Sequence, residues 1–414
     1  MQANNRIPDL SRLGRRFALV KVQLLIELIA CWAGSDGVGR APQRRGGAKR
    51  ETMSQALAIP DAEQVSAAWL TEALRAGGLT DATVKSVSTG RVGTGQAARA
   101  YRFELEYERP DPSFPRSIVG KFPSTDPEHR KVAAEYKTYL REINFYRILQ
   151  PQLSVSTPKC FYADIDGNGP DFILLLEDVS PARQGDQIAG CSPAVARRSV
   201  LDLVGLHAPS WRNPAMLDFD WLSNGDVDQY NAFIRKSYKT GYPQFLERCA
   251  GGLDQDELRV LRRLAETPVF PSEPPELKAY CLIHSDYRLD NLLVDDSVEP
   301  NRTFLVDWQT LIVGNPMRDL AYFLGGCLLP EDRRPVEQDI VRDYHGKLLA
   351  AGVEGYSWET CWDDYRRATF LGVMTAVVGM VFVDRTERGD QLFATMGKRH
   401  LLQALELGAE DFIR

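Results

Sequence analysis

The chain has 414 residues, of which 44% are apolar, and its formal net charge is -6. A chain of this length and composition can bury one large or two moderate cores, which excludes disorder throughout. Residues 1–52 hold ten Lys or Arg and four acids, so 40 basic and 52 acidic residues remain in the rest. This acidic body argues against a nucleic-acid partner, which would select a basic face.

The seven cysteines are scattered without any CxxC pair, and several lie in apolar runs. This pattern is typical of reduced, buried thiols in a cytoplasmic protein. We therefore expect a cytoplasmic location, and neither disulfides nor a zinc site. The cysteines are Cys31, Cys160, Cys191, Cys249, Cys281, Cys327 and Cys361.

Residues 1–52 differ in character from the sequence that follows, because much of this segment is rich in Gly and Arg without periodicity, whereas Met53 begins like a new N-terminus. We expect an amphipathic or unstructured extension, which an overextended start would explain. The alternative is a signal or membrane anchor in residues 15–34. Its apolar run contains Lys21 and Glu27 and falls short of the ~20 apolar residues of a membrane span, so we expect no membrane partner.

The first predicted elements are a short helix and three strands. Residues 61–78 open with Asp61, a capping residue, show helical spacing of apolar residues and end in Gly. Residues 83–108 and 116–122 alternate apolar and polar residues, or are rich in β-branched and aromatic residues, between turns rich in Gly and Pro. They predict three antiparallel strands.

A long helix is predicted over 127–149, followed by a hairpin over 159–179. The chain then becomes mostly helical, interrupted by a small strand pair in residues 280–296 and a third strand at 303–307. The fold class is therefore α+β, with a small β-rich lobe at 53–178 and a larger helical lobe at 179–414. The helical segments of the second lobe are 194–211, 228–248, 254–266 and several from 338 to the end.

The segment from His284 to Asn291 reads HxDxxxxN and joins two apolar runs. Phosphoryl transfer requires magnesium held on oxygen ligands, bound phosphates and an oriented nucleophile. Asp286 can accept a hydroxyl proton, and the side-chain carbonyl of Asn291 can ligate a metal. Asp307 ends the next strand and is a second metal carboxylate, at the same end of the predicted hairpin as Asn291. The alternative is that these residues only form Asx turns.

A glycine-rich turn and a lysine precede this motif. Gly90, Gly93 and Gly95 lie between two predicted strands, where backbone N–H groups could approach phosphates, although hairpins are often glycine-rich. Lys121 stands in an apolar strand, where an ammonium calls for an anionic partner unless it lies on an exposed edge.

The sequence also predicts a carboxylate partner for Lys121 and a segment that could bind the adenine base of a nucleotide. Glu135 and Glu142 lie two turns apart on one stripe of the predicted long helix, and spacing alone does not choose between them. The apolar strand that follows leads to the lobe junction, where backbone groups of Glu177, Asp178 and Val179 could bind adenine.

The sequence resembles the aminoglycoside phosphotransferase and choline kinase superfamily, specifically its ecdysteroid-kinase-like branch. The resemblance rests on six motifs in this order: the glycine-rich turn, the strand lysine, the helix glutamate, LLLEDV, HSDYRLDN and VDW. The resemblance extends from about residue 65 to the C-terminus. It implies a bilobal kinase-like fold with ATP between the lobes. It also implies Asp286 as catalytic base, Asn291 and Asp307 as Mg²⁺ ligands, Lys121 as phosphate anchor and Glu142 as its partner.

Two departures from the protein-kinase pattern favour a small hydroxylated molecule as the acceptor. Ser285 replaces the Arg of HRD, and Asp307-Trp308-Gln309 replaces DFG. Only eleven residues separate Asp307 from Asp319, which leaves no room for a long peptide-docking segment. Asp319 either caps the following helix and holds the loop, or participates directly.

The sequence thus predicts an ATP- and Mg²⁺-dependent kinase of a small molecule. The first alternative is a nucleotide-binding pseudokinase or scaffold, which would not need Lys121, Asp286, Asn291 and Asp307 together. The second is a metal-dependent phosphohydrolase, which would need a further His/Asp cluster.

Overall fold

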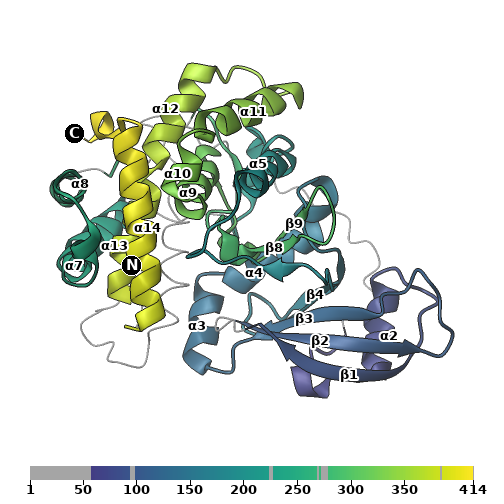
Figure 1. Cartoon of the computed structure of the whole chain (residues 1–414). Helices are drawn as coiled ribbons and strands as arrows, with labels where there is room; N and C mark the ends of the chain where they lie inside the picture. The colour runs from purple at the N-terminus through teal and green to yellow at the C-terminus, as the bar shows by residue number, and fades with distance from the viewer. Residues whose placement is uncertain are drawn as a thin grey trace, which may run out of the picture.

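The computed structural model describes residues 57–93, 98–222, 227–267, 270–271, 278–382 and 385–413. A β-rich part carries the N-terminal elements, and the helices gather in a second, larger part (Figure 1). The extension expected at residues 1–52 and the predicted phosphate-turn residue Gly95 lie outside the described residues.

The N-terminal part is built on a five-stranded antiparallel sheet with the order β1-β2-β3-β5-β4. The three predicted strands and the predicted hairpin are confirmed. Their bounds are Val84–Val92 for β1, Ala98–Tyr107 for β2, Ser117–Pro123 for β3, Cys160–Ile165 for β4 and Phe172–Glu177 for β5.

One face of this sheet is covered by the helix α2, Ala67–Ala76, which buries Leu70 and Leu74 in a core shared with the strands. The predicted start of this helix is wrong. Asp61 precedes only a 3₁₀ turn, and Ser66 caps α2 by accepting a hydrogen bond from the Trp69 backbone N–H.

The long helix predicted over 127–149 is broken, and that prediction is wrong. Its first part, α3, is Pro127–Glu135, and its second, α4, is Thr138–Asn144, which continues into a π-helical turn. Lys137 between them has φ 58°, a left-handed conformation that ends one helix and redirects the next. Because of this break, α4 is almost completely buried, whereas α3 is mostly exposed or half-buried.

Short strands interrupt the helical part. The strands predicted at 291–295 and 303–307 are confirmed as β8, Leu292–Asp295, and β9, Arg302–Leu305, which are antiparallel. The sequence reading missed β6, Arg183–Gln184, which pairs with β8. The apolar run before the HxDxxxxN segment forms the strand β7, Cys281–Ile283, as its composition predicts. It pairs with β10, Ile312–Gly314, which the sequence reading also missed.

The helices of this part form two apolar cores. One core contains α5, α9, α11 and α12 and extends to α4, and the other contains α7, α8, α13 and α14. Within the described segments, no helix has the length and apolarity that a membrane span requires. The bounds are α5 Pro193–Asp202, α6 Val204–His207, α7 Val227–Cys249, α8 Gln255–Glu266, α9 Met317–Cys327, α10 Pro330–Arg333, α11 Glu337–Ala350, α12 Trp358–Ala368, α13 Phe370–Phe382 and α14 Glu387–Glu406.

Candidate active site

The loop between β7 and β8 brings two predicted site residues into contact. Asn291 donates a hydrogen bond from Nδ2 to the Asp286 carboxylate at 2.8 Å and another to the Asp286 backbone carbonyl at 2.9 Å. The Asp286 side chain is only 6% exposed. Since Nδ2 faces Asp286, the Oδ1 atom of Asn291 is the part of the amide that can serve a metal ion.

Asp319 fixes the start of this loop. Its carboxylate accepts hydrogen bonds from the backbone N–H groups of His284 at 2.7 Å and Ser285 at 2.8 Å. These bonds support Ser285 in a left-handed conformation, φ 68°. Asp319 does not cap α9, whose N-cap is Pro316. Of the two alternatives for Asp319, the structure therefore favours loop positioning over direct participation.

A buried histidine stands behind Asp319. His207 Nε2 lies 3.4 Å from the Asp319 carboxylate, and its Nδ1 lies 2.7 Å from the Tyr344 hydroxyl. His207 therefore belongs to the support of the loop. Its distance of 112 residues from Asp319 along the chain left no local sequence signal.

Asp307 follows β9 at the same end of the hairpin as Asn291, as predicted. Leu292 pairs with Leu305, and the Val306 backbone N–H donates to the Asn291 carbonyl at 3.0 Å. Asp307 itself has φ 67°, a conformation that a non-glycine residue rarely adopts. Its side chain is 34% exposed and can therefore be reached by a bound group.

Lys121 on β3 joins this turn to α4. Its Nζ lies 2.8 Å from the Glu142 carboxylate and 2.9 Å from Asp307 Oδ1. Of the two glutamates left open by spacing, Glu142 is therefore the one that contacts the lysine. Glu142 also accepts a hydrogen bond from Gln309 Nε2 at 3.1 Å.

The electrostatics of this cluster keep the lysine and Asp307 charged. Burial opposes the charged form of Lys121, but the nearby carboxylates of Asp307 and Glu142 outweigh it and raise the pKa of the lysine. Burial likewise opposes ionisation of Asp307, but the Lys121 ammonium outweighs it and holds the pKa of Asp307 below its usual range. The lysine can therefore act as a permanent cation for phosphates.

The pKa of Asp286 is shifted in the opposite direction from that of Asp307. Burial raises the pKa of this carboxyl, although Arg288, His284 and the Asn291 amide oppose the shift. The Arg288 Nε lies 3.1 Å from the Asp286 carboxylate, and the Arg288 Nη1 lies 2.9 Å from Asp290 Oδ2. The sequence reading did not single out Arg288 or Asp290, although both lie within the HxDxxxxN segment.

The glycine-rich turn is described in part. Gly90 lies in β1 opposite Arg102, and Gly93 has φ +71°. A Cβ atom at either position would meet nothing within 4 Å, so both backbones have open space beside them. This geometry is consistent with a close approach of a ligand to the backbone.

The segment from Glu177 to Val179 follows β5 into the lobe junction. The Asp178 carboxylate accepts hydrogen bonds from Arg102 Nε at 2.7 Å and Ser117 Oγ at 2.8 Å, so it is already engaged. The Glu177 N–H donates to the Lys159 carbonyl, and the Val179 carbonyl accepts from Ala182. Contacts to a nucleotide base would therefore come from the other backbone groups of this segment.

The oxygen donors present fit a magnesium ion. Asn291 supplies an amide oxygen and Asp307 a carboxylate, and Mg²⁺ prefers such ligands with water and phosphate completing its shell. Within the described ranges, no group of three or more His, Cys, Asp or Glu side chains is arranged to hold a metal. A magnesium ion here would thus depend on oxygen atoms of its nucleotide.

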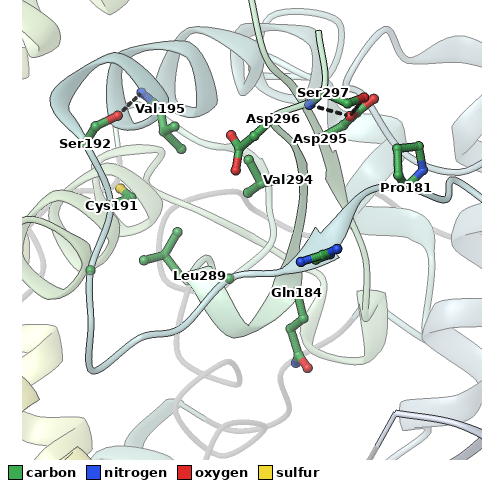
Figure 2. A pocket seen from close by; sticks show the side chains of 13 residues that line it. Pro181, Gln184, Cys191, Ser192, Val195, Leu289, Val294, Asp295, Asp296 and Ser297 are labelled. Atoms are coloured by element: carbon green, nitrogen blue, oxygen red, sulfur yellow. Dashed lines mark hydrogen bonds between the residues drawn. The ribbon is translucent and has the colours of Figure 1, made fainter.

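A cavity of about 510 Å³ lies beside this site, between β6, β8 and the start of α5 (Figure 2). It borders the loop between β7 and β8 at Leu289, and the Asp296 side chain faces it. Asp286, Asn291 and Asp307 do not line it. The cavity is therefore distinct from the candidate active site.

Comparison with known families settles the relationship. The model of the ecdysteroid kinase-like family matches residues 93–352, more than half of the chain. The chain belongs to the ecdysteroid kinase-like family. The matched region includes β3, α4, the loop between β7 and β8 and the turn at Asp307, and the expected ecdysteroid-kinase-like branch is thereby confirmed.

Individual relatives are more distant. A 4-hydroxytryptamine kinase from Psilocybe cyanescens is 26% identical over 189 residues, which cover 43% of this chain and 48% of that protein. The chain therefore spans about half the length of this relative. Choline kinase from Cryptosporidium parvum Iowa II has a TM-score of 0.51 at 10% identity, covering 83% of this chain and 97% of that structure. A microcompartment-associated aminopropanol kinase has a TM-score of 0.42 at 17% identity, with 83% and 99% covered.

The likeness to choline kinase concerns the fold alone. It confirms the expected bilobal, kinase-like α+β architecture, with a β-rich N-terminal lobe and a mainly helical C-terminal lobe.

Proposed function

We propose that this protein is a kinase that transfers the γ-phosphoryl group of ATP to a hydroxyl group of a small molecule. The observation that carries the proposal is the convergence of four groups from distant parts of the chain. Lys121 contacts Asp307, Asp286 contacts Asn291, and the Val306–Asn291 backbone bond joins the two pairs. These are the groups that phosphoryl transfer requires for phosphate binding, metal binding and proton removal.

In this mechanism the protein positions charges and one proton acceptor. Lys121, held by Glu142, binds the phosphates of ATP, and Asn291 Oδ1 with the Asp307 carboxylate would hold Mg²⁺. The metal would neutralise charge on the phosphate oxygens. Asp286 orients the acceptor hydroxyl and takes its proton as the oxygen attacks the γ-phosphorus and ADP leaves. Burial raises the pKa of Asp286, which improves its ability to accept that proton.

The short connection between Asp307 and α9 favours a small molecule, and not a peptide, as the acceptor. The chain passes through the 3₁₀ turn Trp308–Thr310, then β10, and enters α9 at Met317. These elements are buried, so the connection contains no long exposed segment for peptide docking. The distant relative named as a 4-hydroxytryptamine kinase also supports a small hydroxylated acceptor.

The remaining alternative is a scaffold that binds a nucleotide without transfer. Two substitutions separate it from a kinase, with calorimetric Mg-ATP affinity and ADP release as the measurements and a pool of hydroxylated metabolites as acceptors. Asp307→Asn should weaken Mg-ATP binding together with turnover. Asp286→Asn should leave Mg-ATP affinity within about threefold and lower transfer by roughly 10² to 10⁴, the range for a positioned base.

Asp296→Asn is the matched control, because Asp296 is exposed beside the neighbouring cavity and should leave both quantities unchanged. Wild-type protein that binds Mg-ATP but releases no more ADP than Asp286→Asn with every acceptor would favour the scaffold.

A further inference from the structure

Arg288 is a nearly buried cation next to the proposed base. Its side chain is 17% exposed, and its guanidinium group contacts Asp286 through Nε at 3.1 Å and Asp290 through Nη1 at 2.9 Å. Two carboxylates therefore compensate the cost of desolvating this cation. One of them, Asp286, must also face the acceptor during transfer if the proposed function is correct.

Asp290 is held independently of Arg288. Its carboxylate accepts from the Gln187 backbone N–H at 3.3 Å, and its backbone carbonyl accepts from Gln184 Nε2 at 2.6 Å. Asp290 is thus fixed to the segment that follows the lobe junction. It holds one end of the guanidinium group while the other end faces Asp286.

The guanidinium group of Arg288 has unbonded hydrogen-bond donors on the side that faces Asp286. In arginine, Nε–H and Nη2 form one edge of the planar group, and Nε is the atom that contacts Asp286. Across the described part of the chain, Nη1 is bonded to Asp290, whereas Nη2 makes no hydrogen bond. The Nη2 donors therefore lie on the edge directed toward the base.

A phosphoryl group in transit would lie within reach of this edge. The acceptor oxygen must come within about 3 Å of the Asp286 carboxylate, and the phosphorus within about 3.5 Å of that oxygen. A guanidinium whose Nε is 3.1 Å from the same carboxylate then borders the phosphoryl oxygens. Its planar set of donors matches the geometry of such oxygens.

We propose that Arg288 is a further catalytic residue, which donates hydrogen bonds to the phosphoryl group during its transfer. The inference rests on the proposed function. The acceptor O–P bond forms, the P–O bond to ADP breaks, and the hydroxyl proton passes to Asp286. Arg288 remains protonated throughout and stabilises the charge on the phosphoryl oxygens.

The test compares Mg-ADP binding with and without aluminium fluoride, which occupies the place of the phosphoryl group in transit and needs no identified acceptor. Calorimetry on the full chain should show that aluminium fluoride tightens Mg-ADP binding in wild type. In Arg288→Met, the fluoride-dependent increase in affinity should be smaller by a factor of roughly 10², as expected for one removed donor. The affinity for Mg-ADP without fluoride should stay within about threefold of wild type. Arg183→Met, which removes an exposed arginine of β6, should behave as wild type.

Arg288→Lys keeps a cation at this position. It is the second variant, to be used if Arg288→Met unfolds at a much lower temperature than wild type. It should fold, bind Mg-ADP normally and recover only part of the fluoride-dependent gain, because a lysine lacks the planar donor edge. If Arg288→Met or the folded Arg288→Lys keeps the full gain, the inference fails and the proposed kinase stands. Equal losses with and without fluoride would assign Arg288 a structural role and also overturn the inference. If wild type shows no gain, both the inference and the proposed function fail.

Discussion

Lys121 Nζ lies 2.9 Å from Asp307 Oδ1, so a strand of the N-terminal sheet forms an ion pair with a turn 186 residues later in the chain. The same ammonium contacts Glu142 at 2.8 Å. If Asp307 binds magnesium, this carboxylate must exchange part of its contact with Lys121 for the metal, while Glu142 continues to hold the lysine. The arrangement of these three charges leads to the first prediction.

Lys121→Ala should weaken ATP binding most, because the ammonium contacts the phosphates directly. Glu142→Ala should weaken it less, since this carboxylate only positions the lysine. Glu135→Ala is the control and should have little effect, because Glu135 lies at the end of α3 and is not the glutamate that contacts Lys121. Calorimetric ATP titrations measure all three, and a larger loss in Glu135→Ala than in Glu142→Ala would contradict the assignment.

Asp319→Asn should destabilise the protein and reduce turnover. An amide offers one acceptor oxygen where the carboxylate serves the N–H groups of both His284 and Ser285, so one buried donor loses its partner. Such a loss costs about 1–3 kcal/mol in the free energy of unfolding. Urea denaturation measures this change, with Asp339→Asn on the exposed face of α11 as control. Equal unfolding midpoints for the two variants would show that Asp319 does not support the loop.

Acidification should destabilise the fold through His400. Burial lowers the pKa of His400 to about 3, helped by the nearby Arg333 and Arg399 cations, although the bond to Gln403 opposes the shift. The unfolded chain binds this proton near pH 6.5, so the stabilisation by neutral His400 is complete above that pH and declines as the pH falls toward 3.

At pH 5 the resulting loss is roughly 2 kcal/mol of unfolding free energy relative to pH 7. Denaturation of wild type and His400→Gln at both pH values measures it, and the variant should show a flatter dependence whatever its absolute stability. Parallel curves for the two proteins would mean that His400 titrates normally in the folded state.

Phe145→Ala should destabilise the protein by about 3–5 kcal/mol, the range for removal of a buried aromatic side chain. Phe145 stacks on Trp308, with ring centroids 3.6 Å apart and an interplanar angle of 10°. Because Trp308 adjoins Asp307, the substitution should also weaken Mg-ATP binding. Tyr107→Ala, in the N-terminal sheet and away from this stack, is a control for general destabilisation, and its nucleotide affinity should stay unchanged. Unaltered affinity in Phe145→Ala would show that the stack does not position Asp307.

The predictable parts of the fold are those with strong local patterns. The strands of the N-terminal sheet alternate clearly, and Asp286, Asn291 and Asp307 lie in short segments next to apolar runs. The break at Lys137 was missed, because a lysine gives no local sign of a positive φ and the apolar spacing continues through it. The support of the loop by His207 was missed for another reason, since only the packing of distant helices brings it to Asp319.

Helix α4 belongs to the N-terminal lobe by sequence but is attached to the helical lobe. Arg141 Nε donates to the Trp221 carbonyl at 2.9 Å, Phe145 stacks on Trp308, and Gln309 donates to Glu142. α4 also contacts the sheet, because the Tyr139 ring lies 4.5 Å from the Phe172 ring of β5 and the Tyr139 hydroxyl accepts a hydrogen bond from the Ser124 backbone N–H. It is therefore bonded to both lobes, so a substitution that loosens α4 should disturb Lys121 on the sheet and Asp307 on the helical side together.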